Sequence, residues 1–251
     1  MPSLKSHRLP LGKAASISFL SLLLMIVGAA TQAKGDSGAG NGITIFPPNA
    51  TPVSIQPSYS DWTAKWWQWN FTIPNSTNPT LDLTGANCGV GQSGPVFYLA
   101  GAPVTTPITR TCTVPPDRLL FFPLINAECS NVEAPPFFGM NEEQLRACAK
   151  SVIDGVSVSS LKLTIDGIPF TVGANFRFQS PLFTYTVPAD NQQGVAGGTS
   201  PISISDGYWV FLQLSRGKHV LSFQADVTSG PGAGFSQDVT YNLTIPRAGT
   251  D

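Results

Sequence analysis

Residues 118–129 read "RLLFFPLINAEC", an almost unbroken apolar run that ends in polar residues. Successive side chains of a strand point to opposite faces, so a run without alternation predicts a strand buried on both faces. Pro123 lies inside this run and predicts a bulge or a strand end. Residues 95–101, "PVFYLAG", show the same pattern. Two such strands need a layer of structure on each side of their sheet.

Residues 161–172, "LKLTIDGIPFTV", predict an antiparallel hairpin. Asp166-Gly167 is a favoured pair for a two-residue type I′ turn, and this turn places Ile165 opposite Ile168. The apolar side chains of the two strands then share one face. Residues 208–227 predict a second hairpin, which turns around Ser215–Gly217.

The remaining pattern is also mostly that of short strands. Residues 237–245, "QDVTYNLTI", alternate between polar and apolar side chains, and we find no internal repeat. A helix is predicted after the N-cap Asn141, because Glu142 and Glu143 then occupy its first turn. We therefore expect a mainly β protein, an antiparallel β-sandwich or jelly roll with two short helices and two disulfides.

The other predicted helix is the tryptophan-rich segment 60–71, "SDWTAKWWQWNF", with Ser60 as its N-cap and Pro74 shortly after its end. At about 100° per residue, Trp62, Trp66 and Trp69 fall on one side, and Trp67 and Phe71 fall on the other. We expect the first stripe to pack on the buried strands. The second stripe is either core beneath residues 73–94 or an exposed platform on which a sugar ring stacks.

Four cysteines indicate a disulfide framework, since an even count in an exported chain is typically bridged. Three pairings are possible, and we favour the local one, Cys88–Cys112 and Cys129–Cys148. A site with four thiolate ligands is the alternative, but the sequence has no CxxC pair. We expect no metal ion, and the absence of phosphate-binding and dinucleotide motifs predicts no cofactor.

The N-terminus predicts export. Three basic residues precede an apolar run that ends in small residues at Ala33, which is the layout of a signal peptide. We expect residues 1–33 to be removed, residues 34–58 to be a flexible mature terminus that becomes ordered near Ile43, and residues 59–247 to be one β-sandwich domain. A transmembrane anchor is the alternative. The expected location is secreted or periplasmic, without stable membrane insertion after cleavage.

The mature chain would carry 11 Lys and Arg residues against 15 Asp and Glu residues, a formal charge of −4. Nucleic-acid binding needs a basic surface, so no nucleic-acid partner is expected.

Several segments together resemble a family of secreted bacterial proteins to which no reaction is assigned. They are "SDWTAKWWQWNFTIP", "TGANCGVGQSGPVFYLAG", "RTCTVP", "FFPLINAECS", "IDGIPF" and "DGYWVFLQLSRGKHVLSF". The likeness covers about residues 55–245. It implies export and a single domain, and it implies no catalytic residue.

The candidate site residues follow the buried strand 118–129. Asn126, Glu128 and Glu133 lie at its end, next to Cys129, and Arg177 could pair with an acid there. Because His219 is the only histidine of the mature chain, a Ser-His-Asp triad would have to use it. A structural role for His219 is the simpler interpretation.

We expect non-catalytic binding of carbohydrate or a cell-envelope polymer, with Trp67, Phe71, Asn126, Glu128 and Arg177 contacting the ligand. The alternative is an extracellular glycoside hydrolase or polysaccharide lyase that uses Glu128 and a second carboxylate. A third possibility is a structural envelope or matrix protein.

Overall fold

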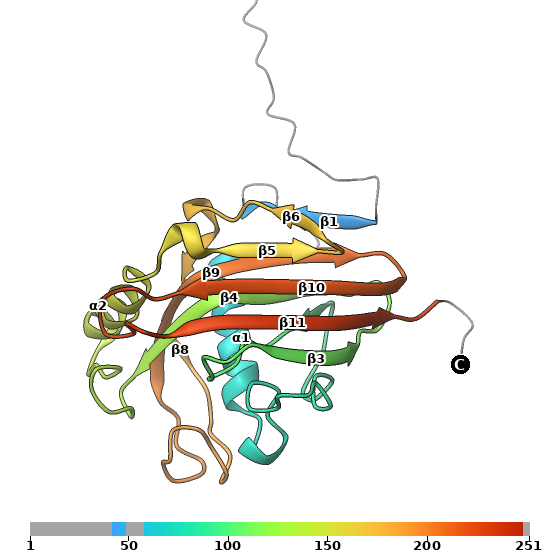
Figure 1. Cartoon of the computed structure of the whole chain (residues 1–251). Coiled ribbons are helices and arrows are strands. Elements are labelled where there is room, and N and C mark those ends of the chain that lie inside the picture. The colour runs from blue at the N-terminus through green and yellow to red at the C-terminus, as the bar shows by residue number, and fades with distance from the viewer. Residues whose placement is uncertain (1–41, 49–57, 248–251) are drawn as a thin grey trace, which may run out of the picture. The chain divides into compact units, whose positions relative to one another are not determined.

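Two β-sheets form the framework of the described chain (Figure 1). The computed structural model describes residues 42–48 and 58–247. The first sheet has the order β1 (Ile43–Phe46), β9 (Ile202–Leu214), β4 (Leu119–Ser130) and β2 (Val96–Tyr98), and β7 (Arg177–Gln179) and β8 (Phe183–Thr184) also pair with β9. The second sheet has the order β3 (Ile108–Thr113), β11 (Ser236–Ile245), β10 (Gly217–Asp226), β5 (Lys162–Ile165) and β6 (Ile168–Phe170). The helical elements are α1 (Tyr59–Phe71), α2 (Glu142–Ile153) and the 3₁₀ turns η3 (Asn75–Thr77), η4 (Val158–Ser160) and η5 (Ala174–Phe176).

The two sheets pack face to face around one apolar core. Phe122 of β4 and Phe223 of β10, for example, meet across the layers with ring centroids 5.2 Å apart. The expected mainly β fold with two helices is therefore confirmed, and its arrangement is that of a sandwich. Most strand pairs are antiparallel, but β2 runs parallel to β4, and β3 runs parallel to β11. The jelly-roll alternative stays a prediction.

Strand β4 is buried on both faces, as its sequence predicts. Phe122 and Leu124 face the second sheet, whereas Phe121 faces α1. The register of β4 against β9 shifts between Pro123 and Ile125, so the bulge expected at Pro123 is confirmed.

One predicted hairpin is confirmed and the other is wrong. Ile165 pairs with Ile168 across a turn in which Asp166 and Gly167 both have positive φ. The segment around Ser215–Gly217 instead carries the chain from β9 in the first sheet to β10 in the second. The strands on either side of this turn bury their apolar residues in the same inter-sheet core, so alternation alone does not distinguish a hairpin from a crossing between sheets.

The first tryptophan stripe docks α1 onto the first sheet, as predicted. Trp62, Trp66 and Trp69 are all buried against β2, β4 and β9. The indole nitrogen of Trp66 donates a hydrogen bond of 2.9 Å to the Leu99 carbonyl. Trp209 of β9 packs edge-on against the Trp66 ring at 5.6 Å.

The N-terminal cap of α1 differs from the prediction. Ser58, not Ser60, is the N-cap, and it forms a capping box with Asp61. This reciprocal pair satisfies two backbone N–H groups at the helix start. Ser60 lies inside the helix, which ends at Phe71, ahead of Pro74, as expected.

The second stripe of α1 is covered by the segment after β8 and not by residues 73–94. Phe71 is 6% exposed and packs on Tyr185 with ring centroids 4.7 Å apart. Trp67 is half-buried and packs on Phe71 at 4.8 Å. The alternative of an exposed aromatic platform is therefore wrong for Phe71, while Trp67 keeps part of its surface open.

Both local disulfides are confirmed. Cys129–Cys148 joins the end of β4 to α2, whose N-cap is Asn141 as predicted.

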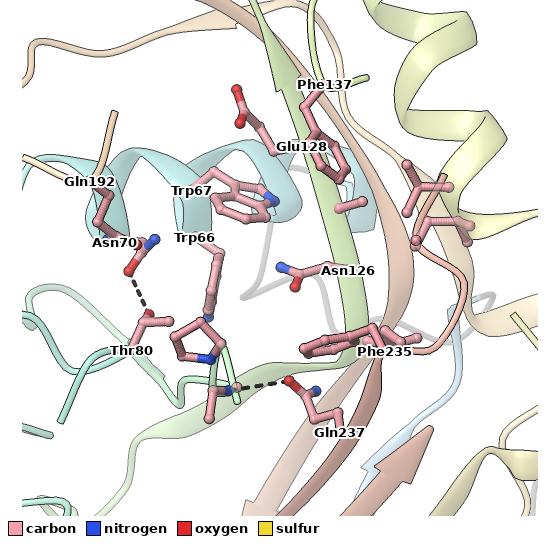
Figure 2. A pocket seen from close by; sticks show the side chains of 18 of the residues that line it. Trp66, Trp67, Asn70, Thr80, Asn126, Glu128, Phe137, Gln192, Phe235 and Gln237 are labelled. Carbon is pink, nitrogen blue, oxygen red and sulfur yellow. Dashed lines mark hydrogen bonds between the residues drawn. The ribbon is translucent and has the colours of Figure 1, made fainter. Parts of the chain in front are cut away.

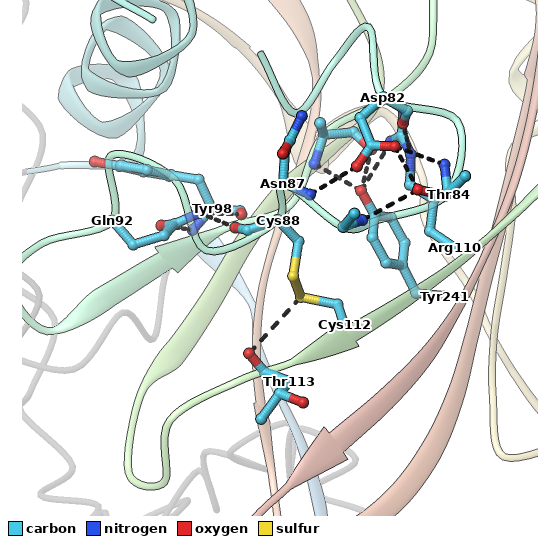
Figure 3. The surroundings of a disulfide bond; sticks show 12 residues. Asp82, Thr84, Asn87, Cys88, Gln92, Tyr98, Arg110, Cys112, Thr113 and Tyr241 are labelled. Atoms are coloured by element: carbon cyan, nitrogen blue, oxygen red, sulfur yellow. Dashed lines mark hydrogen bonds between the residues drawn. A yellow bond between two sulfur atoms is a disulfide. The ribbon is translucent and has the colours of Figure 1, made fainter. Parts of the chain in front are cut away.

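Cys88–Cys112 holds residues 80–101 beside β3 (Figure 3). Arg110, 1% exposed, lies two residues before Cys112 and binds the carbonyl oxygens of Thr80, Asp82, Ala100 and Gly101 at 2.7–3.0 Å.

The predicted signal peptide and most of the predicted flexible terminus lie outside the described residues. The described part begins close to Ile43, where β1 pairs with β9. Neither helix of the described part is long and apolar enough to cross a membrane.

We predict that Trp66→Ala lowers the free energy of unfolding by about 3–5 kcal/mol, because it empties a large buried aromatic site. It also leaves the Leu99 carbonyl without its donor. Leu83→Ala is the control: Leu83 is 47% exposed, so its loss should change stability by less than about 0.5 kcal/mol. Chemical denaturation measures both. Equal stability of Trp66→Ala and the parent would show that the stripe does not anchor the helix.

Candidate functional site

A cavity of about 410 Å³ lies between α1, β4 and the end of the second sheet (Figure 2). Its walls are mainly aromatic and aliphatic, and the aromatic rings belong to Trp66, Trp67, Phe71, Phe137 and Phe235. The cavity follows an open edge of β4. Strand β2 pairs only with Leu119–Phe121, so within the described residues the stretch from Phe122 to Cys129 has no strand partner on that side.

The bulge in β4 turns the polar end of this strand toward the cavity. Before the bulge, even-numbered residues such as Phe122 face the inter-sheet core, and Phe121 faces α1. After it, Ile125 and Ala127 face the core instead. Without the extra residue, Asn126 and Glu128 would continue the even-numbered, core-facing series, where burial of a carboxyl group is costly. The bulge instead places both on the side of α1.

Gly207 of β9 leaves the space that Asn126 occupies. It pairs with Asn126 in the register of β4 and β9. A Cβ atom added at Gly207 would lie 2.8 Å from the Asn126 Cβ and 2.7 Å from the Ile125 carbonyl oxygen. Any larger residue there would push Asn126 away from its present position.

Gln237 and Arg110 fix the opposite wall. The Gln237 side chain donates to the Leu124 carbonyl at the bulge and accepts from the Ala102 backbone N–H at 3.2 Å. Arg110 binds the Ala100 and Gly101 carbonyls, which lie just before Ala102. Because these bonds are buried, they hold the wall segment 101–103 firmly against the two sheets.

Three buried polar atoms at the cavity have no hydrogen-bond partner among the described residues. They are Trp67 Nε1, Asn126 Nδ2 and Gln193 Oε1, and all three side chains line the cavity. Figure 2 shows the Trp67 nitrogen and the Asn126 amide directed into the same space. Buried polar groups in folded proteins are nearly always paired with protein atoms, ordered water or a ligand, so these three atoms mark places where water or a ligand supplies the partner.

A pair of carboxyl groups also lines the cavity. Glu128, 5% exposed, accepts a hydrogen bond from the Ser203 hydroxyl, and Ser130 donates to Glu133 at 3.3 Å. The two carboxyl groups lie close enough for each to influence the ionisation of the other. Burial raises the pKa of Glu128 well above its ordinary value of 4.5, and the neighbouring Glu133 charge raises that pKa further. Burial also raises the pKa of Glu133. The pair therefore retains a proton that isolated carboxylates would lose.

Four of the five residues predicted to bind a ligand come together here: Trp67, Phe71, Asn126 and Glu128 all line the cavity. Arg177 does not. Its guanidinium binds both oxygens of Asp206, at 3.0 and 2.8 Å, and one oxygen of Asp154 at 2.9 Å. Arg177 therefore pairs with two acids, Asp206 on β9 and Asp154 directly after α2, and not with an acid at the end of β4.

Several cavity residues could not be predicted. Gln193 lies in a loop rich in glycine and polar residues, and Phe235 lies before β11, and neither carries a local signal. Glu133 did carry a local signal, because it closely follows Glu128 and the disulfide-bonded Cys129.

His219 lies away from the cavity. Its ring nitrogens contact Asp166 at 2.7 Å and the Ser215 carbonyl at 2.9 Å, so the structural interpretation fits.

Within the described residues, no group of three or more His, Cys, Asp or Glu side chains is arranged to hold a metal ion.

No family model, curated protein or solved structure matches this chain.

The raised pKa of Glu128 predicts how stability depends on pH. Above about pH 4.5 the folded state binds more protons than the unfolded chain, so the free energy of unfolding falls as the pH rises. Glu128→Gln cannot ionise and should flatten this decline. Denaturation curves between about pH 5 and pH 8 measure the slope.

Glu143→Gln is the matched control, because Glu143 lies exposed on α2 and carries the same charge. It should keep the slope of the parent protein. Identical slopes for the parent and Glu128→Gln would show that Glu128 ionises in the folded state as it does in the unfolded chain.

Proposed function

We propose that this is an exported, non-catalytic binding protein whose cavity accepts a carbohydrate unit. The observation that carries the proposal is the combination of aromatic walls with unpartnered polar atoms at Trp67, Asn126 and Gln193. Ligand sites typically join an apolar surface to a few convergent polar groups, in cavities of about 300–1,000 Å³.

A saccharide unit matches both parts of this surface. The carbon-bound hydrogens of a sugar ring form apolar faces that pack on aromatic rings, and its hydroxyl groups both donate and accept hydrogen bonds. Trp67 Nε1 and Asn126 Nδ2 are donors, and Gln193 Oε1 is an acceptor. Trp67 enters the site with the N–H edge of its ring, because Phe71 packs on the ring itself.

The hydrolase alternative needs two carboxyl groups about 5–5.5 Å or about 6.5–9.5 Å apart, so that a sugar or a water fits between them. Glu128 and Glu133 are close neighbours whose pKa values are both raised, and each accepts a hydrogen bond from a serine hydroxyl. We propose binding as the simpler role for this pair.

Export is supported by the signal-peptide pattern of residues 1–33 and by the two disulfides, which persist in oxidising compartments. A secreted or periplasmic location also brings the cavity into contact with envelope and environmental polysaccharides.

We predict that Asn126→Leu separates binding from stability. Leucine has a similar size, and the Asn126 amide nitrogen has no partner to lose among the described residues, so stability should stay equal or rise by up to about 1 kcal/mol. Affinity for the saccharide should fall about tenfold or more. Thermal melts measure the stability, and tryptophan fluorescence on a glycan panel measures the binding.

Asn141→Leu is the matched control. Asn141 does not line the cavity, and its side chain caps α2 by accepting a hydrogen bond of 3.0 Å from the Gln144 backbone N–H. This variant should lose about 0.5–2 kcal/mol of stability and keep its affinity. If Asn126→Leu bound the saccharide as tightly as the parent, the cavity would not be the binding site.

A further inference from the structure

The cavity walls carry negative charge only. Among the described residues, Glu128 and Glu133 are the only ionisable side chains that line the cavity, and none of the Lys, Arg and His residues described does so. Neither carboxyl group forms a salt bridge with any cation of the described residues. A carboxyl group as deeply buried as that of Glu128 is usually paired with a cation, and half-buried Glu133 supplies none, so a ligand can provide the missing positive charge.

The surroundings of the pair are neutral. Ser203 donates to Glu128, Ser130 donates to Glu133, and Tyr185 is the other titratable group near both. Figure 2 shows Glu128 at the end of the cavity where Trp67 and Phe137 also lie. A cation placed there would meet the carboxyl oxygens, which attract positive charge.

We propose that the bound saccharide is an amino sugar whose protonated amine contacts Glu128 and Glu133. This inference rests on the carbohydrate-binding function proposed above and narrows the class of ligand. The ammonium group donates to the carboxyl pair, and the ring oxygens accept from Trp67 and Asn126. A neutral sugar would satisfy the second set of contacts only. An N-acetylated sugar would bring a bulky, uncharged amide to the carboxyl pair.

The contact between the ammonium group and the carboxyl pair changes the number of protons that the pair holds. The ammonium group enters with its own proton and keeps it. Its positive charge stabilises the ionised form of both carboxyl groups, so the proton that they share leaves for solvent. Binding of the amino sugar should therefore release protons, and binding of a neutral sugar should not. Tyr185 stays protonated throughout, because burial and the two carboxylates raise its pKa.

The test compares three β-1,4-linked disaccharides that differ only at the second carbon of each ring: deacetylated chitobiose, N,N′-diacetylchitobiose and cellobiose. Calorimetric titrations of the exported protein at about pH 6, where aliphatic amines are protonated, measure their affinities. We expect the deacetylated sugar to bind about tenfold or more tightly than the other two. Repeating its titration in buffers of different ionisation enthalpy measures the protons released.

Glu128→Gln and Glu133→Gln should each abolish both the amine preference and the proton release. Glu143→Gln, exposed on α2, removes the same charge elsewhere and should change neither. Thermal melts establish that each variant is folded, and cellobiose binding establishes that its cavity is intact.

Equal affinity for the three sugars would overturn the inference and leave the proposed carbohydrate binding standing. Tighter binding of the neutral sugars would overturn it as well. Binding of none of the three, with or without the amine, would count against the proposed function itself. An amine preference that survives in both glutamine variants would place the ammonium group elsewhere.

Discussion

The packing of the α1 tryptophan stripe on the first sheet is the contact on which the rest of the structure depends. Strands β4 and β9 are apolar on both faces, so their sheet is stable only when both faces are covered. The second sheet covers one face, and Trp66 with its neighbours covers the other. Each large aromatic ring removes about 150–250 Å² from water, which explains why one short helix suffices. Trp67 follows Trp66 directly, so docking of one ring brings the next to the cavity.

The cavity is made by two departures from regular β structure. The bulge in β4 changes which side chains face α1, and the short β2 leaves the edge of β4 open beyond Phe121. Together they bring Asn126 and Glu128 to a space that aromatic rings enclose. The unpaired polar atoms and the uncompensated carboxyl pair reduce stability, and such local violations of folding rules are expected at functional sites. The disulfides and Arg110 support the walls that carry them.

Much of the candidate site was visible in the sequence because it lies on strongly patterned elements. Trp67 and Phe71 follow from helical periodicity, and Asn126 and Glu128 follow from the polar end of a buried strand. Arg177 was placed wrongly because its partner depends on strand register: β7 pairs with β9, which sets Arg177 near Asp206. No local pattern reports which distant strand a short strand joins.

The sequence by itself predicted most of the strands, the two helices and the register of the Asp166-Gly167 hairpin, and it favoured, among three possible cysteine pairings, the one that the structure shows. Each of these depends on residues close in the chain, through periodicity, turn chemistry or short loops. Only the tertiary structure decided that β9 and β10 lie in different sheets, that residues 183–187 cover the second face of α1, and that Glu133 joins Glu128 at the same cavity. The local pattern of each of these segments is compatible with several partners. Which partner a segment contacts depends on how the whole chain buries its apolar surface.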